Sequence, residues 1–342
     1  MSPPSRRVAI IGLGMAVAPH AQSLRDLAAR VEVAAAYSPS AARRAAFAAR
    51  FGFPVTDSLQ AILNDRDIDA ALLLTPPNTH AELAGQLARA GKHILMEKPV
   101  EASPEKAREL VRACAEAGVT LGVVFQHRFR PGALALRALI DAGRLGRIAA
   151  ANVHVPWWRP QSYYDEPGRG TLARDGGGVL ITQAIHVLDL FLSLTGGVAE
   201  VAAFSATTSL HRMQSEDYAA AALRLSNGGI GALMATTAAY PGFAERIELI
   251  GERGTAVLAA GQLQVHFHDG TVASAGESGA SGGGADPMAF ANDAHRAVLA
   301  DFLDALDHGR QPAAHGAEAL KVHALIEAVL LSARQGAPVR VE

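Results

Sequence analysis

The feature that most constrains the fold is the alternation of short apolar strands with helices in the first third of the chain. Strands that alternate with helices form parallel sheets, because each helix is the crossover connection. The strands run directly into segments of small and polar residues, namely Gly12-Leu13-Gly14 after 8–11, Ser38 after 31–37, Thr75–His80, and Glu97-Lys98-Pro99. The sequence therefore predicts a doubly wound α/β domain whose functional groups follow the strand ends.

Apolar periodicity and turn residues give the expected elements of this domain. Strands are expected at 7–11, 31–37, 70–74, 93–97 and 120–125, and helices at 17–29, 40–51, 58–64, 80–90 and 104–117.

The pattern changes after residue 126, where strands come to dominate. A helix is expected at 131–142, a strand at 147–155, a polar aromatic loop at 157–174 and a helix at 179–194. Strands at 198–208, 217–226, 229–240, 245–251 and 254–260 follow, with hairpin turns at Asn227-Gly228 and Asp269-Gly270. Helices at 290–308 and 315–335 close the chain, after a Gly/Ser/Ala-rich stretch at 276–286 that we expect to be mobile. We predict a parallel-sheet domain at 1–125 and an α+β domain with a large open antiparallel sheet at 126–342.

Composition excludes several classes of protein. The 342 residues carry 31 basic and 33 acidic side chains, which gives no field for nucleic acid or an anionic membrane. We expect no membrane span, because the longest apolar runs look too short. Cys114 is the single cysteine of the sequence, which suits a reducing, cytoplasmic location.

The Gly12-x-Gly14 turn is typical of a dinucleotide site. Gly12 permits the tight turn, and Gly14 lacks the Cβ that would meet a phosphate. The third position of this fingerprint is Val17 rather than a small residue, so an ordinary strand-to-helix turn is the alternative.

The end of the second strand bears on which cofactor is bound. NAD-specific sites usually place a carboxylate there to accept the ribose hydroxyls, but this chain has Ser38. Arg43 or Arg44 in the next helix could approach a 2′-phosphate, which favours NADP slightly over NAD. The alternative is that both arginines only solvate a helix face.

Two residues are candidates for proton chemistry. Lys98, fixed after a buried strand, could polarise a substrate oxygen, and a lysine on the surface is the alternative. His186 could serve as a base, with Thr182 and Gln183 on the same helix face and Asp189 to orient it. The alternative for His186 is a core histidine bonded to backbone.

Together these segments resemble the Gfo/Idh/MocA oxidoreductases, the glucose–fructose oxidoreductase and inositol dehydrogenase group. The segments that carry the resemblance are IGLG (11–14), TPPNTH (75–80), MEKP (96–99), FQHRFRPG (125–132), RGT (169–171) and DGGGVLITQAIHVLD (175–189). The resemblance implies a Rossmann domain, a second domain with an open antiparallel sheet, and an active site between them.

The resemblance also implies roles for individual residues. Lys98 matches the catalytic lysine and His186 the catalytic histidine. The residues matched to the cofactor are Gly12, Leu13, Gly14, Met15, Ser38, Arg43, Thr75, Pro76, Asn78, His80, Glu97, Lys98, Trp158 and Arg159. The residues expected on the substrate side are Lys98, Arg128, Tyr163, Arg169, Thr182, Gln183 and His186.

One departure from the family pattern matters. Many inositol dehydrogenase-like members have an aspartate four residues before the histidine, where this chain has Thr182. A threonine cannot accept the substrate's proton, so the role of base rests on His186, and inositol becomes a weaker guess for the substrate.

The predicted function is hydride transfer between NAD or NADP and a secondary alcohol or ketone of a sugar, sugar acid, cyclitol or sugar nucleotide. We expect no metal, because the histidines are scattered and His266-x-His268 has no partnered ligand. Two alternatives stay open. One is a tightly bound cofactor that recycles within the site, giving sugar–sugar oxidoreduction or glycoside cleavage through a keto intermediate, and the other is a non-catalytic dinucleotide sensor. The apolar strand 231–235 predicts a homodimer or homotetramer through the open sheet.

Overall fold

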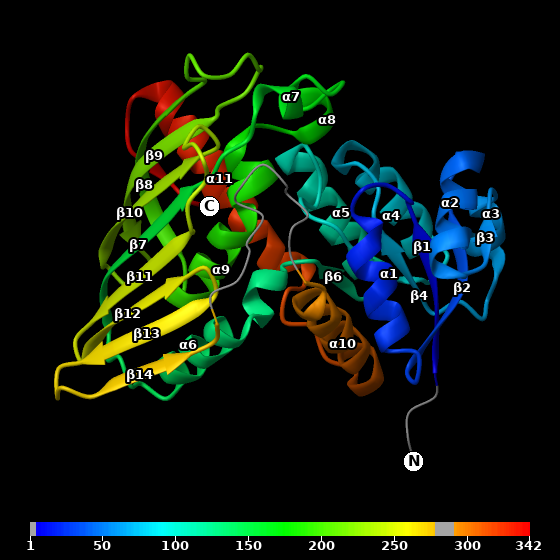
Figure 1. Ribbon diagram of the computed structural model, residues 1–342, viewed down its shortest axis with the longest axis horizontal. Coiled ribbons are helices and arrows are strands. Elements are labelled where there is room, and N and C mark those ends of the chain that lie inside the picture. The colour runs from blue at the N-terminus through cyan, green and yellow to red at the C-terminus, as the bar shows by residue number, and fades with distance from the viewer. Residues whose placement is uncertain (1–4, 278–290) are drawn as a thin grey trace. The chain divides into compact units, whose positions relative to one another are not determined.

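The computed structural model describes residues 5–277 and 291–342, and the chain divides into two compact units (Figure 1). The first unit holds Met1–Gln126 together with Ala291–Leu320, and the second holds His127–Phe290 with Lys321–Glu342. The sequence analysis expected domains at 1–125 and 126–342, with all of the C-terminal helices in the second. Instead, helix α10 (Asp293–His308) belongs to the first unit, where its buried face packs on α1 (Val17–Asp26).

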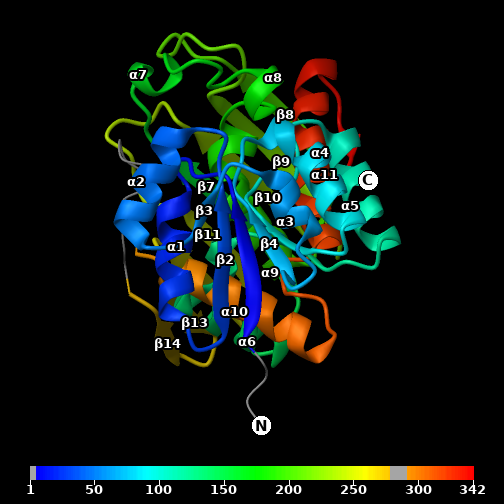
Figure 2. The same ribbon diagram turned by 90° about the vertical axis from the view of Figure 1, so that its right-hand side faces the viewer.

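The first unit is built on a parallel sheet in the order β3-β2-β1-β4-β5-β6, seen in Figure 2. Its strands are β1 (Arg6–Ile11), β2 (Val31–Tyr37), β3 (Val55–Thr56), β4 (Ala70–Leu73), β5 (His93–Met96) and β6 (Leu121–Val123). Its other helices are α2 (Ala41–Phe51), α3 (Leu59–Asn64), the short η1 (Pro77–Thr79), α4 (His80–Arg89) and α5 (Pro104–Glu116). The central strands are buried on both faces, which is why they read as unbroken apolar runs. The expected elements are confirmed, and the two-residue β3 is an addition.

The second unit is built on a nine-stranded sheet in the order β14-β13-β12-β11-β7-β10-β9-β8-β15. Its strands are β7 (Ile148–Pro156), β8 (Val198–Ala206), β9 (Tyr218–Leu225), β10 (Ile230–Thr236), β11 (Arg246–Gly251), β12 (Gly254–Ala259), β13 (Gln262–Phe267), β14 (Val272–Ala275) and β15 (Val339–Arg340). Both predicted hairpin turns join neighbouring strands, β9 to β10 and β13 to β14. The predicted large antiparallel sheet is confirmed, with one parallel pair between β7 and β10. The expected mobile stretch at 276–286 lies almost entirely outside the described residues.

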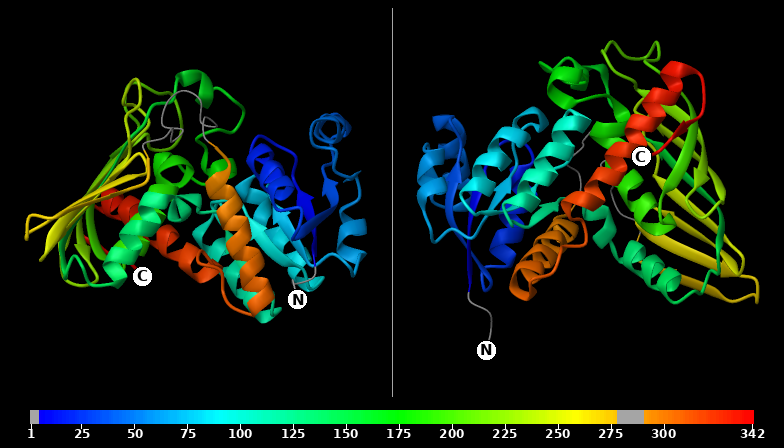
Figure 3. Two further views of the ribbon diagram at one scale, coloured as in Figure 1. Left: turned by 60° about the horizontal axis from the view of Figure 1, so that its bottom comes forward. Right: turned by 180° about the vertical axis from the view of Figure 1, so that it is seen from behind.

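Helices cover one face of this sheet (Figure 3). They are α6 (Pro131–Asp141) and α9 (Ile185–Thr195), and α11 (Gly316–Gln335) is tied to β8 by Ser332, whose Oγ accepts from the Ala203 N–H at 2.9 Å. The short helices η2 (Gln126–Phe129), α7 (Gln161–Tyr164) and α8 (Leu172–Asp175) lie in the connections.

The helical stretch Leu172–Thr195 corrects two expectations. It is long and apolar enough to pass a test for a membrane span, although the sequence analysis expected no such run. However, 89% of its apolar window is buried inside the protein, as in a core helix. In addition, its turn at Leu180–Ala184 (η3) is π-helical rather than α-helical. Single π turns often occur at functional sites.

Candidate functional site

The carboxyl edge of the parallel sheet gathers the first group of candidate residues. The Leu74 N–H donates to the Ile11 carbonyl at 2.8 Å, and the Glu97 N–H donates to the Leu73 carbonyl at 2.9 Å. The ends of β1, β4 and β5 are therefore consecutive neighbours. This arrangement brings the glycine turn, the loop that starts at Thr75 and the Glu97-Lys98 pair to one edge, where open α/β sheets bind ligands.

The glycine turn fits a phosphate group. Gly12 has φ of +103°, and a Cβ there would lie 2.8 Å from the Leu74 carbonyl carbon and oxygen. Nothing lies within 4 Å of a Cβ built on Gly14, so that position faces open space. Leu13 is buried while Met15 is 53% exposed. Helix α1 begins just beyond at Val17 without a side-chain cap, and the Val17 N–H donates to the Gly14 carbonyl at 3.3 Å.

His80 joins two parts of this edge. Its side chain is fully buried, with Nε2 2.9 Å from the Thr75 carbonyl and Nδ1 3.1 Å from the carbonyls of Pro99 and Val100. Burial lowers the pKa of His80. His80 therefore holds the loop after β4 against the segment after Lys98. Pro76 and Asn78, by contrast, are exposed.

At the end of β2, Arg43 and Arg44 have different surroundings. Ser38 is buried, and its Oγ accepts from the Ser40 N–H at 3.3 Å. Arg44 donates to the Ser38 carbonyl at 2.6 Å and pairs with Asp57 at 3.4 Å. The Arg43 side chain is exposed, and its backbone N–H donates to the Oγ of Ser40, the residue that caps α2. Arg43 is thus the arginine with more freedom to reach a ligand.

Glu97 meets two histidines that the sequence analysis did not connect with it. The Nε2 of His20, from α1, lies 2.7 Å from Glu97 Oε1, and the His20 and His295 rings pack edge to face at 5.1 Å. The other Glu97 oxygen accepts the Lys98 backbone N–H at 3.1 Å. His20, Glu97 and His295 have ligand atoms within 4.8 Å of one another, a spacing that would allow a metal ion. The expectation that the histidines stay scattered is therefore wrong for His20, whereas the absence of a metal stays a prediction.

In the second unit, the triple glycine admits an acidic cap at the start of the long helix. A Cβ on Gly178 would lie 1.8 Å from the Glu216 carbonyl oxygen. Glu216 accepts from the N–H groups of Gly178 at 3.2 Å and Leu180 at 3.1 Å. Burial raises the pKa of Glu216 despite these bonds. Sequence analysis missed Glu216 because it follows 38 residues later in a loop before β9.

His186 and Asp189 have neighbours from η2. The rings of His186 and His127 stack with centroids 5.3 Å apart. Arg128 binds both carboxylate oxygens of Asp189, at 2.6 and 2.7 Å. Asp189 was expected to orient His186, which stays a prediction; its carboxylate holds the guanidinium of Arg128 through two hydrogen bonds. His127 was missed, although it stands beside Arg128 in the FQHRFRPG segment.

The polar aromatic loop contributes a cluster around Tyr163. The guanidinium of Arg169 lies 4.9 Å from the Tyr163 ring centre and that of Arg159 lies 5.8 Å away. Gln183 donates to the Tyr163 hydroxyl at 3.4 Å and also accepts from Thr182, whose hydroxyl lies 2.6 Å from the Gly178 carbonyl. These expected substrate residues therefore meet in one unit.

Trp158 and Arg159 differ in how deeply they are buried. Trp158 is half-buried against the ring of Tyr240, with centroids 5.5 Å apart, while Arg159 is 3% exposed. Arg159 donates to the Trp158 carbonyl at 2.7 Å, so it stiffens the loop that carries the tryptophan.

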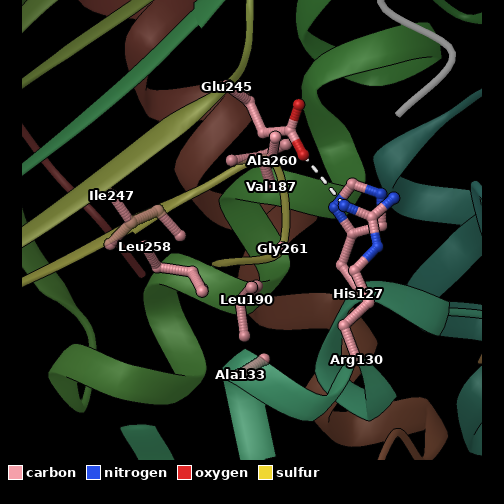
Figure 4. Close-up of a pocket in the computed structure, with 10 residues that line it drawn as sticks. All are labelled: His127, Arg130, Ala133, Val187, Leu190, Glu245, Ile247, Leu258, Ala260 and Gly261. Atoms are coloured by element: carbon pink, nitrogen blue, oxygen red, sulfur yellow. Dashed lines mark hydrogen bonds and ion pairs between the residues drawn. The ribbon is translucent and has the colours of Figure 1, made fainter. Parts of the chain in front are cut away.

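A small pocket lies beside His127 in the second unit (Figure 4). Apolar side chains from α6, α9, β11 and β12 line it, and its polar rim is His127, Arg130 and Glu245. Arg130 pairs with Glu245 at 2.8 Å, as the dashed line shows. The Oε2 atom of Glu245 is buried with no hydrogen-bond partner among the described residues, so a water molecule there would complete the pair.

Two family models match the chain. Residues 6–125 match the oxidoreductase family with an NAD-binding Rossmann fold, and residues 133–257 match the GFO/IDH/MocA C-terminal domain. The chain belongs to the GFO/IDH/MocA oxidoreductase family. It is therefore an enzyme of the dehydrogenase and reductase class with an NAD-binding domain, as the sequence predicted.

Curated relatives and solved structures extend over nearly the whole chain. A 1,5-anhydro-D-fructose reductase of Ensifer adhaerens is 31% identical over 324 residues, 91% of each chain. An inositol 2-dehydrogenase of Rhizobium meliloti is 28% identical and covers 95% of this chain and 96% of its own. The WlbA dehydrogenase from Bordetella pertussis, solved with NADH and UDP-GlcNAcA, has a TM-score of 0.84 at 30% identity, with 99% of each chain covered. A levoglucosan dehydrogenase complex supports the fold. Its TM-score is 0.89 at 24% identity, and the match covers 99% of this chain and 100% of its own.

Proposed function

We propose that this GFO/IDH/MocA enzyme transfers a hydride between a nicotinamide dinucleotide and a secondary alcohol or ketone of a carbohydrate. The substrate class is a sugar, sugar acid, cyclitol or sugar nucleotide, in keeping with what the relatives' names describe. The observation that carries the proposal is the edge formed by Gly12, Thr75 and Glu97-Lys98, which combines a phosphate-sized turn with a lysine on the neighbouring strand end.

Lys98 and His186 divide the work in this proposal. The cofactor, when bound, accepts the hydride from the alcohol carbon or returns it to the ketone. His186 takes the hydroxyl proton during oxidation and gives it back during reduction. The Lys98 ammonium stabilises the negative charge that develops on the oxygen. Lys98 belongs to the first unit and His186 to the second, so the proposal requires both units to contribute to one site.

Turnover with a panel of sugars tests the proposal. Reduction of NAD or NADP is followed by absorbance for the wild type, Lys98→Ala and His186→Ala. Each variant should lose at least about 100-fold in kcat, which is the usual size of a lost proton-transfer or charge-stabilising group. Lys106→Ala is the matched control, because Lys106 is an exposed lysine on α5 and should keep full activity.

Two other outcomes would identify the open alternatives. Cofactor binding without turnover of any sugar would support a dinucleotide sensor and contradict the proposed enzyme. An absorbing cofactor that stays bound through purification would support a recycling oxidoreductase.

For the coenzyme, we propose a slight preference for NADP within the NAD-binding family. Ser38 provides no carboxylate to repel a 2′-phosphate, and Arg43 is the exposed arginine beside it. Ser38→Asp should shift the NADP/NAD ratio of kcat/KM toward NAD by roughly tenfold or more, since it adds a like charge. Arg43→Ala should reduce only the NADP value, and equal losses with both coenzymes would contradict this assignment.

We further propose a homodimer or homotetramer in the cytoplasm, with no nucleic acid or membrane partner. The proposed location rests on Cys114 being the single cysteine of the sequence, which suits a reducing compartment.

A further inference from the structure

A buried chain of side chains in the first unit leads from helix α10 to Glu97 and Lys98. His295 packs on the edge of His20, His20 bonds one oxygen of Glu97, and the other oxygen of Glu97 holds the Lys98 backbone N–H. His20 is 1% and His295 4% exposed. The chain thus links helix α10, almost 200 residues away in the sequence, to the pair that the proposed function places at the cofactor.

Helix α10 is held at both ends, so the position of His295 is well defined. At its start, Asn292 donates to Asp26 of α1 at 2.9 Å, and Arg296 lies 3.5 Å from the same carboxylate. At its end, Asp307 pairs with Arg6 at 3.0 Å and with Arg30 at 3.1 Å. Between these ties, the buried side chains of α10 pack against α1.

The charges around Glu97 favour its ionised form. Burial opposes ionisation, but the His20 hydrogen bond and the positive charges of His20, His295 and Lys98 lower the pKa of Glu97 to about 2. These groups come from three elements that pack around Glu97, namely α1, α10 and the segment after β5. A carboxylate held in this way keeps one orientation at neutral pH.

We propose that His295 is a positioning residue. It acts through His20 to fix the orientation of the Glu97 carboxylate. That carboxylate holds the Lys98 backbone N–H and, in the proposed function, the nicotinamide half of the cofactor. This inference rests on the proposed function. His295 itself does not contact substrate or cofactor in this account. It supplies a buried edge contact to the far side of His20.

A double-mutant cycle on NADH affinity tests the role of His295. The variants are His295→Phe, Glu97→Gln and the double variant, and the dissociation constant for NADH is measured by fluorescence without any sugar. Phenylalanine keeps an aromatic ring that can pack on His20 and removes the ring nitrogens of His295. His295→Phe alone should weaken NADH binding by roughly tenfold, within the usual range of coupling between neighbours. In the Glu97→Gln background the same change should have no effect, because the group through which it acts is gone.

His93→Phe is the matched control, since His93 lies at the opposite end of β5, and its affinity should be unchanged. If His295→Phe fails to fold, His295→Asn enters the same cycle. Equal losses in both backgrounds would show a merely structural residue and overturn the proposal. Stoichiometric Zn²⁺ binding to the wild type that His295→Phe abolishes would also overturn it, because the cluster would then be a metal site.

These outcomes are independent of turnover. If NADH binds and the cycle shows coupling but no sugar is oxidised, the proposed function fails while the positioning role of His295 stands. If sugars are oxidised and the losses are additive, the proposed function stands and the role of His295 fails.

Discussion

At the scale of single residues, Gly12 and Gly14 serve different purposes in one turn. Gly12 has a positive φ and no room for a Cβ, while Gly14 has open space where a ligand would lie. A substitution at Gly12 should therefore affect mainly stability, and one at Gly14 mainly cofactor binding.

Gly12→Ala should destabilise the protein by about 1–3 kcal/mol, because it adds backbone strain and a contact with the Leu74 carbonyl. Gly14→Ala should leave the free energy of unfolding unchanged within about 0.5 kcal/mol and weaken NADH binding. Urea denaturation and NADH fluorescence measure the two effects. A Gly14→Ala variant that binds NADH normally would show that no phosphate approaches this residue.

Glu97 should make stability depend on pH. Its pKa is lowered from 4.5 to about 2 in the folded protein, so the carboxylate stabilises the fold above the unfolded value. That contribution should be lost as pH falls from about 4.5 toward about 2.

Urea denaturation of the wild type and Glu97→Gln at pH values between about 6 and about 3 checks this dependence. The difference in unfolding free energy should shrink with falling pH, whereas Glu109→Gln, an exposed glutamate on α5, should show no such trend. A difference that is constant with pH would mean that Glu97 is not held ionised.

At the scale of elements, the first unit was the more predictable one. The strands β1, β4 and β5 could be predicted from apolar runs, since both faces of a parallel sheet are covered. Gly12, Thr75 and Lys98 could be placed at one edge because all of them follow such strands.

Contacts between distant segments could not be read in this way. The parallel pairing of β7 with β10 depends on where two strands far apart in sequence meet. The contact of His295 with His20 depends on α10 returning to the first unit, and the Glu216 cap depends on a loop folding over Gly178. None of these leaves a local pattern.

The Arg128–Asp189 pair fastens η2 to α9 and carries an element-scale prediction. Asp189 is 1% exposed, so Asp189→Asn would leave the guanidinium of Arg128 without its anion. The loss in unfolding free energy should be about 3–5 kcal/mol, and the apolar double variant Arg128→Met/Asp189→Leu should recover much of it. Thermal and urea unfolding check this, and a single variant as stable as the wild type would contradict the proposed fastening.

At the scale of the whole molecule, the sheet face turned away from α6 and α9 carries an apolar row. Ile230, Ala150 and Ile250 lie side by side on β10, β7 and β11, and Phe204 of β8 is on the same face. Phe204 is 82% and Ile230 63% exposed. An apolar patch of this kind usually marks an interface, and a symmetric one pairs with itself.

Phe204→Glu/Ile230→Glu should therefore convert the oligomer to a monomer, as measured by size-exclusion chromatography with light scattering. Leu134→Glu, at an exposed leucine on α6, is the control and should keep the oligomer. A wild type that runs as a monomer at micromolar concentration would contradict the predicted interface.

The most direct test of the account is a crystal structure with NADH and a sugar that the enzyme turns over. We predict that Lys98 Nζ and a ring nitrogen of His186 both lie within about 2.6–3.2 Å of the same substrate oxygen. A complex in which either nitrogen lies far from that oxygen, with no water between them, would contradict the central claim that one lysine and one histidine share the reacting hydroxyl.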